Sequence, residues 1–268
     1  MAKRKQPKAP KTRSLFLELV SGVDAMRQHR EGRLAPRTHQ VEPIEKASTF
    51  VTPELFRFLK ELRAHNERAW FEANKARYLS RVRDPVLGFV AAIAPKLKAI
   101  SPHIVADPRP SGGSLLRIYR DTRFSRDKTP YKTNVGLRFG HAAGKDIHGP
   151  GYYLHLEPGL VFMAAGMWRP DAEALRAIRE AIVADPKGWT RAKRSPLRHG
   201  EASLRRPPRG FDPEHPLIED LKRTSFTVGA HFTERQACSP SFPALFVAAC
   251  RREAPMMRFL AKGVGLPF

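Results

Sequence analysis

Residues 152–166, YYLHLEPGLVFMAAG, decide the fold, because they predict a β-hairpin that turns at Pro158-Gly159. Apolar residues recur at every second position on both sides of the turn, which is the period of a strand. With Glu157 opposite Leu160, one face is apolar and carries Tyr152, Leu154, Leu156, Val161, Met163 and Ala165. The other face carries Tyr153, His155, Glu157 and Phe162. One side of the hairpin is therefore expected to pack on a hydrophobic core, and the other side carries both polar and aromatic side chains.

Outward from the hairpin, three more segments have strand patterns: residues 114–119, 133–139 and 225–230. Apolar residues at helical spacing precede and follow this group. They predict helices over residues 53–62, 70–78, 86–97, 171–182, 216–221 and 244–262. This order predicts an α+β fold, with a mostly antiparallel meander packed against N- and C-terminal helices.

Local signals predict how the first helices begin and end. Thr52-Pro53-Glu54 places a hydroxyl before a proline and an acid, which predicts a helix start capped by the Thr52 side chain. Pro85 lies in line with the helix that carries Tyr78, and a proline there is expected to end or kink it.

The first 48 residues differ from the rest of the chain. Residues 1–13 hold six Lys or Arg, two Pro and no acid, so residues 1–48 are predicted to be a basic, largely disordered arm. Residues 14–29 within it have the spacing of a short amphipathic helix. The arm either binds nucleic acid or a membrane surface, or only keeps the protein in solution. Residues 49–268 are predicted to form a single α+β domain.

Charge is the strongest compositional signal, because 48 Lys and Arg against 26 Asp and Glu give a formal net charge of +22. Such a surplus attracts anions, so nucleic acid, nucleotides, phosphorylated metabolites and anionic membrane faces are the expected partners. Two cysteines, Cys238 and Cys250, form no disulfide framework, which indicates a reducing, cytoplasmic location. The longest apolar run, residues 161–168, is too short to cross a bilayer, so no transmembrane segment is predicted.

Residues 117–132, RIYRDTRFSRDKTPYK, hold six cations and only two carboxylates. Even if Asp121 and Asp127 each pair with one cation, four positive charges stay uncompensated, which predicts an anionic ligand or nucleic acid as the partner. The predicted anion contacts are Arg117, Arg120, Arg123, Lys128 and Lys132, with Tyr131 as a donor or stacking ring and Asp121 orienting one arginine. Asn66, Arg68 and Asn74 are predicted to form one wall of the pocket.

Two alternatives stay open. In the first, the Arg–Asp pairs, with Phe124 and Pro130 inserted into the core, only stabilise the fold. In the second, the chain is an enzyme acting on a phosphorylated or carboxylated substrate. His155 and Glu157 then supply acid–base chemistry with Tyr153, which shares their strand face. A polar face on an open sheet explains the same three residues without catalysis. The sequence contains no metal-ligand motif and identifies no cofactor.

Five motifs carry a family resemblance. They are Asn66-x-Arg68-x-Trp70-Phe71-x-x-Asn74-Lys75-x-x-Tyr78, the stretch 117–133, Gly151-Tyr152-Tyr153-x-x-x-Glu157-Pro158, Gly166-x-Trp168-x-Pro170 and Pro208-x-Gly210-Phe211-x-x-x-His215-Pro216. Together they resemble DUF2461, a family of bacterial and fungal proteins named for its unknown function, over residues 49–268. The resemblance implies no catalytic residue. This chain departs from the family pattern at Ala69, where the family usually has Glu or Asp, and so lacks one partner for the cations.

Overall fold

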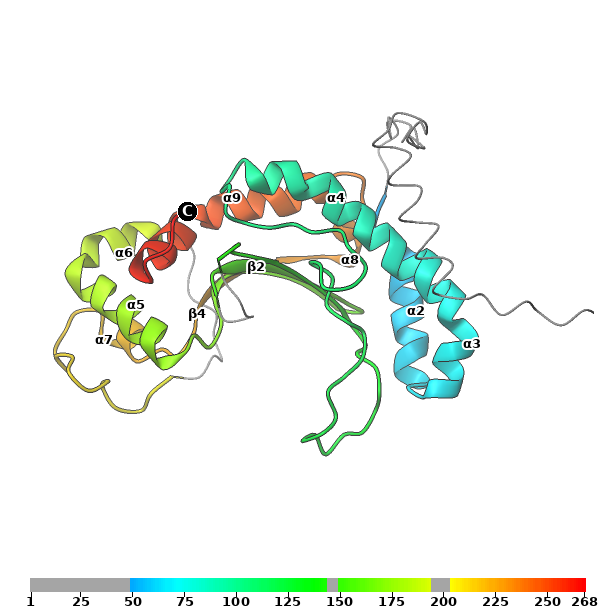
Figure 1. Ribbon diagram of the computed structural model, residues 1–268, viewed down its shortest axis with the longest axis horizontal. Helices are drawn as coiled ribbons and strands as arrows, with labels where there is room; N and C mark the ends of the chain where they lie inside the picture. The colour runs from blue at the N-terminus through cyan, green and yellow to red at the C-terminus, as the bar shows by residue number, and fades with distance from the viewer. Residues whose placement is uncertain (1–48, 144–148, 194–202) are drawn as a thin grey trace, which may run out of the picture. The chain divides into compact units, whose positions relative to one another are not determined.

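The computed structural model describes residues 49–143, 149–193 and 203–268 of the chain (Figure 1). The basic arm and the helix predicted at 14–29 lie outside the described residues. All described residues belong to one compact unit, residues 46–268.

A four-stranded antiparallel sheet forms the centre of this unit. Its strands are β1 (Val135–Gly140), β2 (Gly151–Glu157), β3 (Leu160–Met167) and β4 (Phe226–Phe232), in the order β1-β2-β3-β4. Glu157 pairs with Leu160 across the turn, as predicted, and Gly159 adopts a positive φ of 83°, which a type II turn with proline before glycine requires. With the helices around it, this meander confirms the α+β fold class.

The strand predicted at residues 114–119 is wrong. Only isolated bridges form there, from Leu115 to Leu137 of β1 and from Tyr119 to Tyr131. The reason is that this segment pairs with two different segments along its length. Leu116 N donates to Gly136 O of β1 at 2.9 Å, whereas Ile118 O, two residues later, accepts from Lys132 N at 2.7 Å. Neither pairing is long enough to make a strand.

Nine helices lie in the described ranges. They are α2 (Pro53–Ala64), α3 (Arg68–Tyr78), the π-helical turn η1 (Leu79–Arg83), α4 (Asp84–Lys98), α5 (Ala172–Ala184), α6 (Pro186–Ala192), α7 (Ile218–Leu221), α8 (Glu234–Ala237) and α9 (Phe242–Gly263). All six predicted helices are present, and η1, α6 and α8 were not predicted.

The predicted side-chain cap of the first helix is wrong. The Thr52 side chain makes no capping hydrogen bond, and only its backbone oxygen accepts from Leu55 N, at 3.0 Å. Pro85 was predicted to end or kink the helix that carries Tyr78. That α-helix, α3, gives way after Tyr78 to the π-helical turn η1, and Pro85 follows in the first turn of α4.

The core lies between the apolar face of the sheet and the helices α4 and α9, which Figure 1 shows along one side of the sheet. Phe246 of α9 is the junction, since its ring centre lies 5.5 Å from Phe139 of β1 and 5.7 Å from Phe89 of α4. Burial alternates strictly along β2, so Tyr152 is buried in this core while Tyr153 is half-buried on the opposite face. The predicted two-faced hairpin is therefore confirmed.

Gly166, on β3 beside β4, predicts one large stability effect. Its φ is 133°, and an added Cβ would lie 1.9 Å from the Phe226 carbonyl oxygen, so Gly166→Ala must break the β3–β4 ladder. We expect a loss of about 3 kcal/mol in the free energy of unfolding. Gly159→Ala is the control, because its φ is also positive but nothing lies near the new Cβ. It should cost only about 1 kcal/mol in the same urea titration, and equal losses would contradict this account.

Candidate functional site

Residues 117–132, called here the basic ribbon, form two short arms joined by a tip. Arg120 N donates to Pro130 O at 2.9 Å and Lys132 N donates to Ile118 O at 2.7 Å, so residues 118–120 run beside residues 130–132. Figure 1 shows the ribbon leaving the sheet on the side away from α4 and α9. The tip, residues 121–129, is thereby held by a narrow base.

Tyr131 anchors this base to the N-terminal helices. Its ring is buried and stacks on Phe71 of α3, with ring centres 4.2 Å apart. The Asn66 side chain makes two hydrogen bonds to the backbone of Tyr131. Its amide donates to Tyr131 O at 2.9 Å, and its oxygen accepts from Tyr131 N at 3.0 Å. The side chain thus substitutes for a neighbouring strand. Tyr131 consequently presents its backbone and ring to α2 and α3 rather than to a ligand.

Both carboxylates of the ribbon are occupied by arginines. Asp121 accepts from Arg123 Nη2 at 2.7 Å, and Asp127 accepts from Arg120 and from the backbone N–H of Thr129. The hydrogen bond from Arg123 is the main reason that the pKa of Asp121 falls to about 2. The one from Arg120 lowers the pKa of Asp127 to about 2 in the same way. Each carboxylate carries one negative charge, which one arginine already matches.

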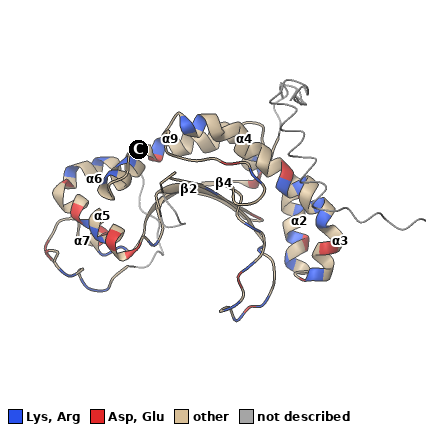
Figure 2. Ribbon diagram, in the orientation of Figure 1, with Lys and Arg blue, Asp and Glu red and all other residues tan. Residues whose placement is uncertain are grey.

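Four cations of the ribbon have no carboxylate partner among the described residues: Arg117, Arg126, Lys128 and Lys132. The two lysines donate to backbone oxygens instead, Lys128 to Thr122 and Lys132 to Arg117, each at 2.9 Å. Burial, with a smaller effect of Arg117, lowers the pKa of Lys132. Figure 2 shows cationic and acidic positions interleaved along the ribbon. Positive charge is therefore in excess after all internal pairing.

Phe124 is the most exposed aromatic residue of the ribbon. Its exposed fraction is 96%, and the Arg123 guanidinium lies 5.8 Å from its ring centre. The alternative that Phe124 inserts into the core is therefore wrong. A single exposed apolar residue is common on protein surfaces, and the Phe124 ring is open to solvent at the tip of the ribbon.

A second group of polar side chains lies on the open face of β2. His155 Nε2 lies 2.9 Å from Glu157 Oε2, and His155 Nδ1 lies 3.1 Å from the Tyr153 hydroxyl. The carboxylate only accepts, so a neutral imidazole donates from Nε2 and accepts the Tyr153 proton at Nδ1. Arg63 of α2 donates to the other Glu157 oxygen at 2.7 Å. We call Tyr153, His155, Glu157 and Arg63 the relay.

The relay is partly enclosed and rests on an aromatic ring. The His155 ring stacks on Phe162 of β3 with centres 4.8 Å apart, and its side chain is 13% exposed. Gly136 of β1 lies opposite His155 and leaves space for the Tyr153 hydroxyl, because an added Cβ would lie 2.8 Å from that oxygen. The three β2 side chains thus form a fixed line rather than a loose polar surface.

The basic ribbon and the relay are connected at three points. Asn134, three residues after Tyr131, places its amide 3.4 Å from His155 Nδ1. Leu116, just before the ribbon, pairs with Gly136. The end of α2 contacts both groups, since Arg63 binds Glu157 while Asn66 follows two residues after the helix and binds Tyr131. One structural unit therefore positions both groups.

The family can now be assigned. The family of conserved hypothetical proteins called DUF2461 matches residues 54–259 of the chain. The chain belongs to the DUF2461 family. No curated protein matches it. The matched range contains the whole basic ribbon and the whole relay of this DUF2461 protein, so the resemblance noted from the five motifs is confirmed.

The predicted pocket wall of the DUF2461 protein is only partly assembled. Asn66 contacts the ribbon directly, and Arg68 lies near enough to influence Tyr131 electrostatically. The Asn74 amide is used inside its own helix, donating to Trp70 O and accepting from Arg77, both at 2.9 Å. Sequence reasoning missed Arg63, Asn134 and Gly136. Only Gly136 left a signal, as a glycine inside a strand pattern.

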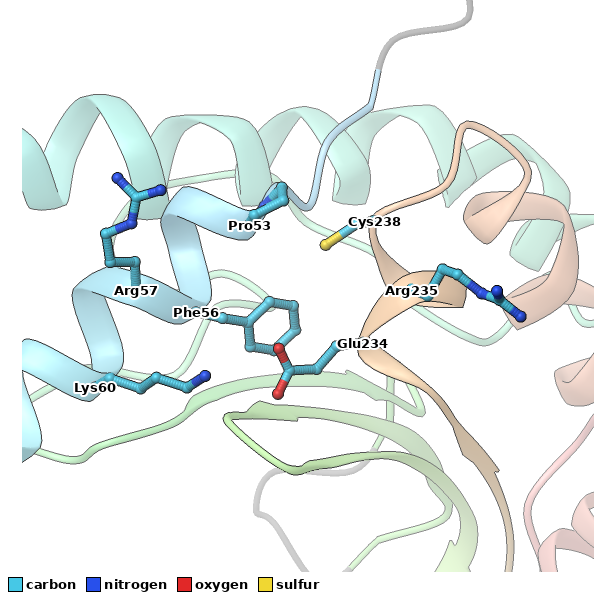
Figure 3. Close-up of a pocket in the computed structure, with 7 residues that line it drawn as sticks. All are labelled: Pro53, Phe56, Arg57, Lys60, Glu234, Arg235 and Cys238. Carbon is cyan, nitrogen blue, oxygen red and sulfur yellow. The ribbon is translucent and has the colours of Figure 1, made fainter.

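A separate cavity of about 500 Å³ opens between α2 and α8 (Figure 3). It is lined by Pro53, Phe56, Arg57, Lys60, Glu234, Arg235 and Cys238. Glu234 accepts from Gly159 N at 2.7 Å, which ties α8 to the hairpin turn. Burial and the nearby Glu234 raise the pKa of the Cys238 thiol, so this cysteine is not activated as a nucleophile.

Residues 49–143, 149–193 and 203–268 contain neither a candidate metal site nor a candidate membrane-spanning helix. No group of three or more His, Cys, Asp or Glu side chains there is placed to hold a metal ion. None of the helices in these ranges combines the length and the apolar character that crossing a membrane requires.

Replacing Asn66 should loosen the basic ribbon without unfolding the protein. Asn66→Asp keeps the shape but removes the donor to Tyr131 O, so we expect a loss of about 1–2 kcal/mol in the free energy of unfolding. Backbone amides of the ribbon should exchange with deuterium faster than in the wild type. Asn74→Asp is the matched control, since Asn74 bonds only within α3. Unchanged exchange in Asn66→Asp would contradict the anchoring role.

The two ribbon carboxylates should titrate independently. Their folded pKa values, about 2, lie below the ordinary 3.8, so each pair stabilises the ribbon above pH 3.8 and is lost as the pH falls towards 2. Arg123→Gln should return the pKa of Asp121 towards 3.8 and leave that of Asp127 near 2. Carboxyl carbon shifts followed by NMR measure both values. A shift of both pKa values in Arg123→Gln would show that the pairs are coupled.

Proposed function

We propose that the basic ribbon binds the sugar–phosphate backbone of nucleic acid. The observation that carries the proposal is the excess of four cations after both ribbon carboxylates have been used. Packing Arg117, Arg126, Lys128 and Lys132 into 16 consecutive residues costs repulsion, which a row of phosphates would offset. The formal net charge of +22 favours the same partner at longer range.

Single strands are the form that fits the ribbon best. Phe124 is 96% exposed at the tip and Tyr119 is 47% exposed on one arm, so both rings offer faces on which unpaired bases can stack. A duplex hides those base faces and would use only the cations. In this proposal Arg120 and Arg123 have a structural role, because their ion pairs with Asp127 and Asp121 fix the conformation of the tip. The uncompensated cations bind the phosphates.

Binding should depend on charges of the ribbon and not on charge in general. Arg126→Ala/Lys128→Ala removes two uncompensated cations, and the slope of log affinity against log salt should fall in magnitude by about 1.4, or about 0.7 for each lost contact with a single strand. The control is Lys187→Ala/Arg191→Ala, which removes two exposed cations from α6. Fluorescence anisotropy with a labelled single-stranded oligonucleotide measures both, with a duplex for comparison.

The outcome separates the proposal from its alternatives. A ribbon that only stabilises the fold predicts that Arg126→Ala/Lys128→Ala lowers the melting temperature and leaves the salt slope unchanged. Equal losses in both double variants would show that net charge alone attracts the oligonucleotide. Tighter binding of the duplex than of the single strand would contradict the stacking role of Phe124 and Tyr119.

A further inference from the structure

We infer that the relay transfers a phosphodiester group onto the Tyr153 hydroxyl, an inference that rests on the proposed nucleic-acid binding. Tyr153, His155 and Glu157 lie in the order nucleophile, base and orienting carboxylate, at 3.1 Å and 2.9 Å. This is the arrangement by which a weak hydroxyl nucleophile is activated in acyl- and phosphoryl-transfer enzymes. Three side chains at alternate positions of one strand produce it without any loop.

Each partner of His155 fixes its role. Glu157 accepts from Nε2, so the lone pair of the neutral ring lies at Nδ1, 3.1 Å from the Tyr153 hydroxyl and 3.4 Å from the Asn134 amide nitrogen. Arg63 holds the second Glu157 oxygen at 2.7 Å, and Phe162 stacks under the ring, so the imidazole cannot turn away. Arg63 is a positioning residue in this scheme, because it acts through Glu157.

The chemistry balances with water as the one further reactant. The Tyr153 oxygen attacks phosphorus and forms a phosphotyrosine diester, while the bond from phosphorus to one sugar oxygen breaks. The Tyr153 proton passes to His155 Nδ1, and the departing oxygen, in line on the far side of phosphorus, takes a proton from water and leaves as an alcohol. The hydroxide so formed attacks the adduct, and the His155 imidazolium returns its proton to the Tyr153 oxygen, which frees Tyr153 and leaves a phosphate monoester.

The cations that would bring a phosphate to Tyr153 are those of the basic ribbon. Arg138 pairs with Tyr153 in the β1–β2 register on the same face. Its guanidinium lies over Gly140, however, whereas the Tyr153 hydroxyl lies beside Gly136, four residues away along β1, so Arg138 is directed away from that hydroxyl. The basic ribbon adjoins the relay through Asn134 and Leu116, so a strand held by the ribbon passes beside Tyr153.

The test traps the covalent adduct. The full-length protein is incubated with a labelled single-stranded oligonucleotide that contains one 5′-bridging phosphorothiolate, whose thiol leaving group cannot re-form the bond. We expect the label on the peptide that contains Tyr153, located by mass spectrometry, and none in Tyr153→Phe. His155→Gln should slow adduct formation about 100-fold or more. Gly136→Ala should slow it as well while oligonucleotide affinity is unchanged, because the new Cβ displaces the Tyr153 hydroxyl.

The neighbouring tyrosine supplies a matched control. Tyr152→Phe removes a hydroxyl that is buried on the other face of β2 and has no hydrogen-bond partner among the described residues, so labelling should equal that of the wild type. Retained oligonucleotide affinity in Tyr153→Phe shows that this variant is folded. Labelling that persists in Tyr153→Phe, or that maps to another residue, overturns the assignment of the nucleophile.

A second substrate separates the failure of this inference from the failure of the proposed function. Bis(4-nitrophenyl) phosphate is a small diester that needs no contact with the ribbon. Oligonucleotide binding without an adduct, and without nitrophenol release, overturns the transfer reaction and leaves nucleic-acid binding intact. Tyr153-dependent nitrophenol release from a protein that binds no oligonucleotide supports the relay and overturns nucleic-acid binding by the ribbon.

Discussion

The register of β2 against β3 is the constraint on which the rest of this structure depends. Glu157 faces Leu160 across a two-residue turn, and this pairing sends Tyr152, Leu154 and Leu156 into the core. A slip by one residue would reverse both faces, burying His155 and Glu157 under α9 and exposing the leucines. The cost of burying those polar groups makes the slip unfavourable, so the core and the relay specify each other.

The end of α2 connects the relay on β2 to the basic ribbon. Arg63 and Asn66 lie three positions apart, and one binds the relay while the other binds the peptide of Tyr131. Stacking of Tyr131 on Phe71 adds an apolar contact to those hydrogen bonds. A charged ribbon with little regular pairing is therefore held at its base by neutral interactions, which salt does not screen. The tip is held by electrostatic pairs: Arg123–Asp121 is exposed and individually weak, and Arg120–Asp127 is half-buried on the Arg120 side.

In the proposed function, the basic ribbon binds the nucleic acid and the neighbouring relay carries out the chemistry. The ribbon has more cations than its carboxylates can neutralise, which suits recognition of a phosphate backbone without regard to sequence. The relay is small, partly enclosed and made of side chains with defined hydrogen-bond directions, which suits chemistry on one bond. Their connection through Asn134, Leu116 and α2 is what makes a combined role physically coherent.

The hairpin, its register, its two faces and the positions of most helices were predictable from the sequence, because strand and helix periodicity are local properties of the chain. The excess of cations in residues 117–132 was predictable for the same reason, because it follows from counting the charged residues in one segment. The strand predicted at 114–119 does not form, because the segment pairs with β1 at Leu116 but with residues 130–132 of the ribbon from Ile118 on. Both partners are distant in sequence, so local periodicity does not reveal the change. Tertiary structure alone decided that Arg63, one of 48 cations, meets Glu157, and that Asn66 meets Tyr131. No pattern in one segment records which surface of another segment will fold against it.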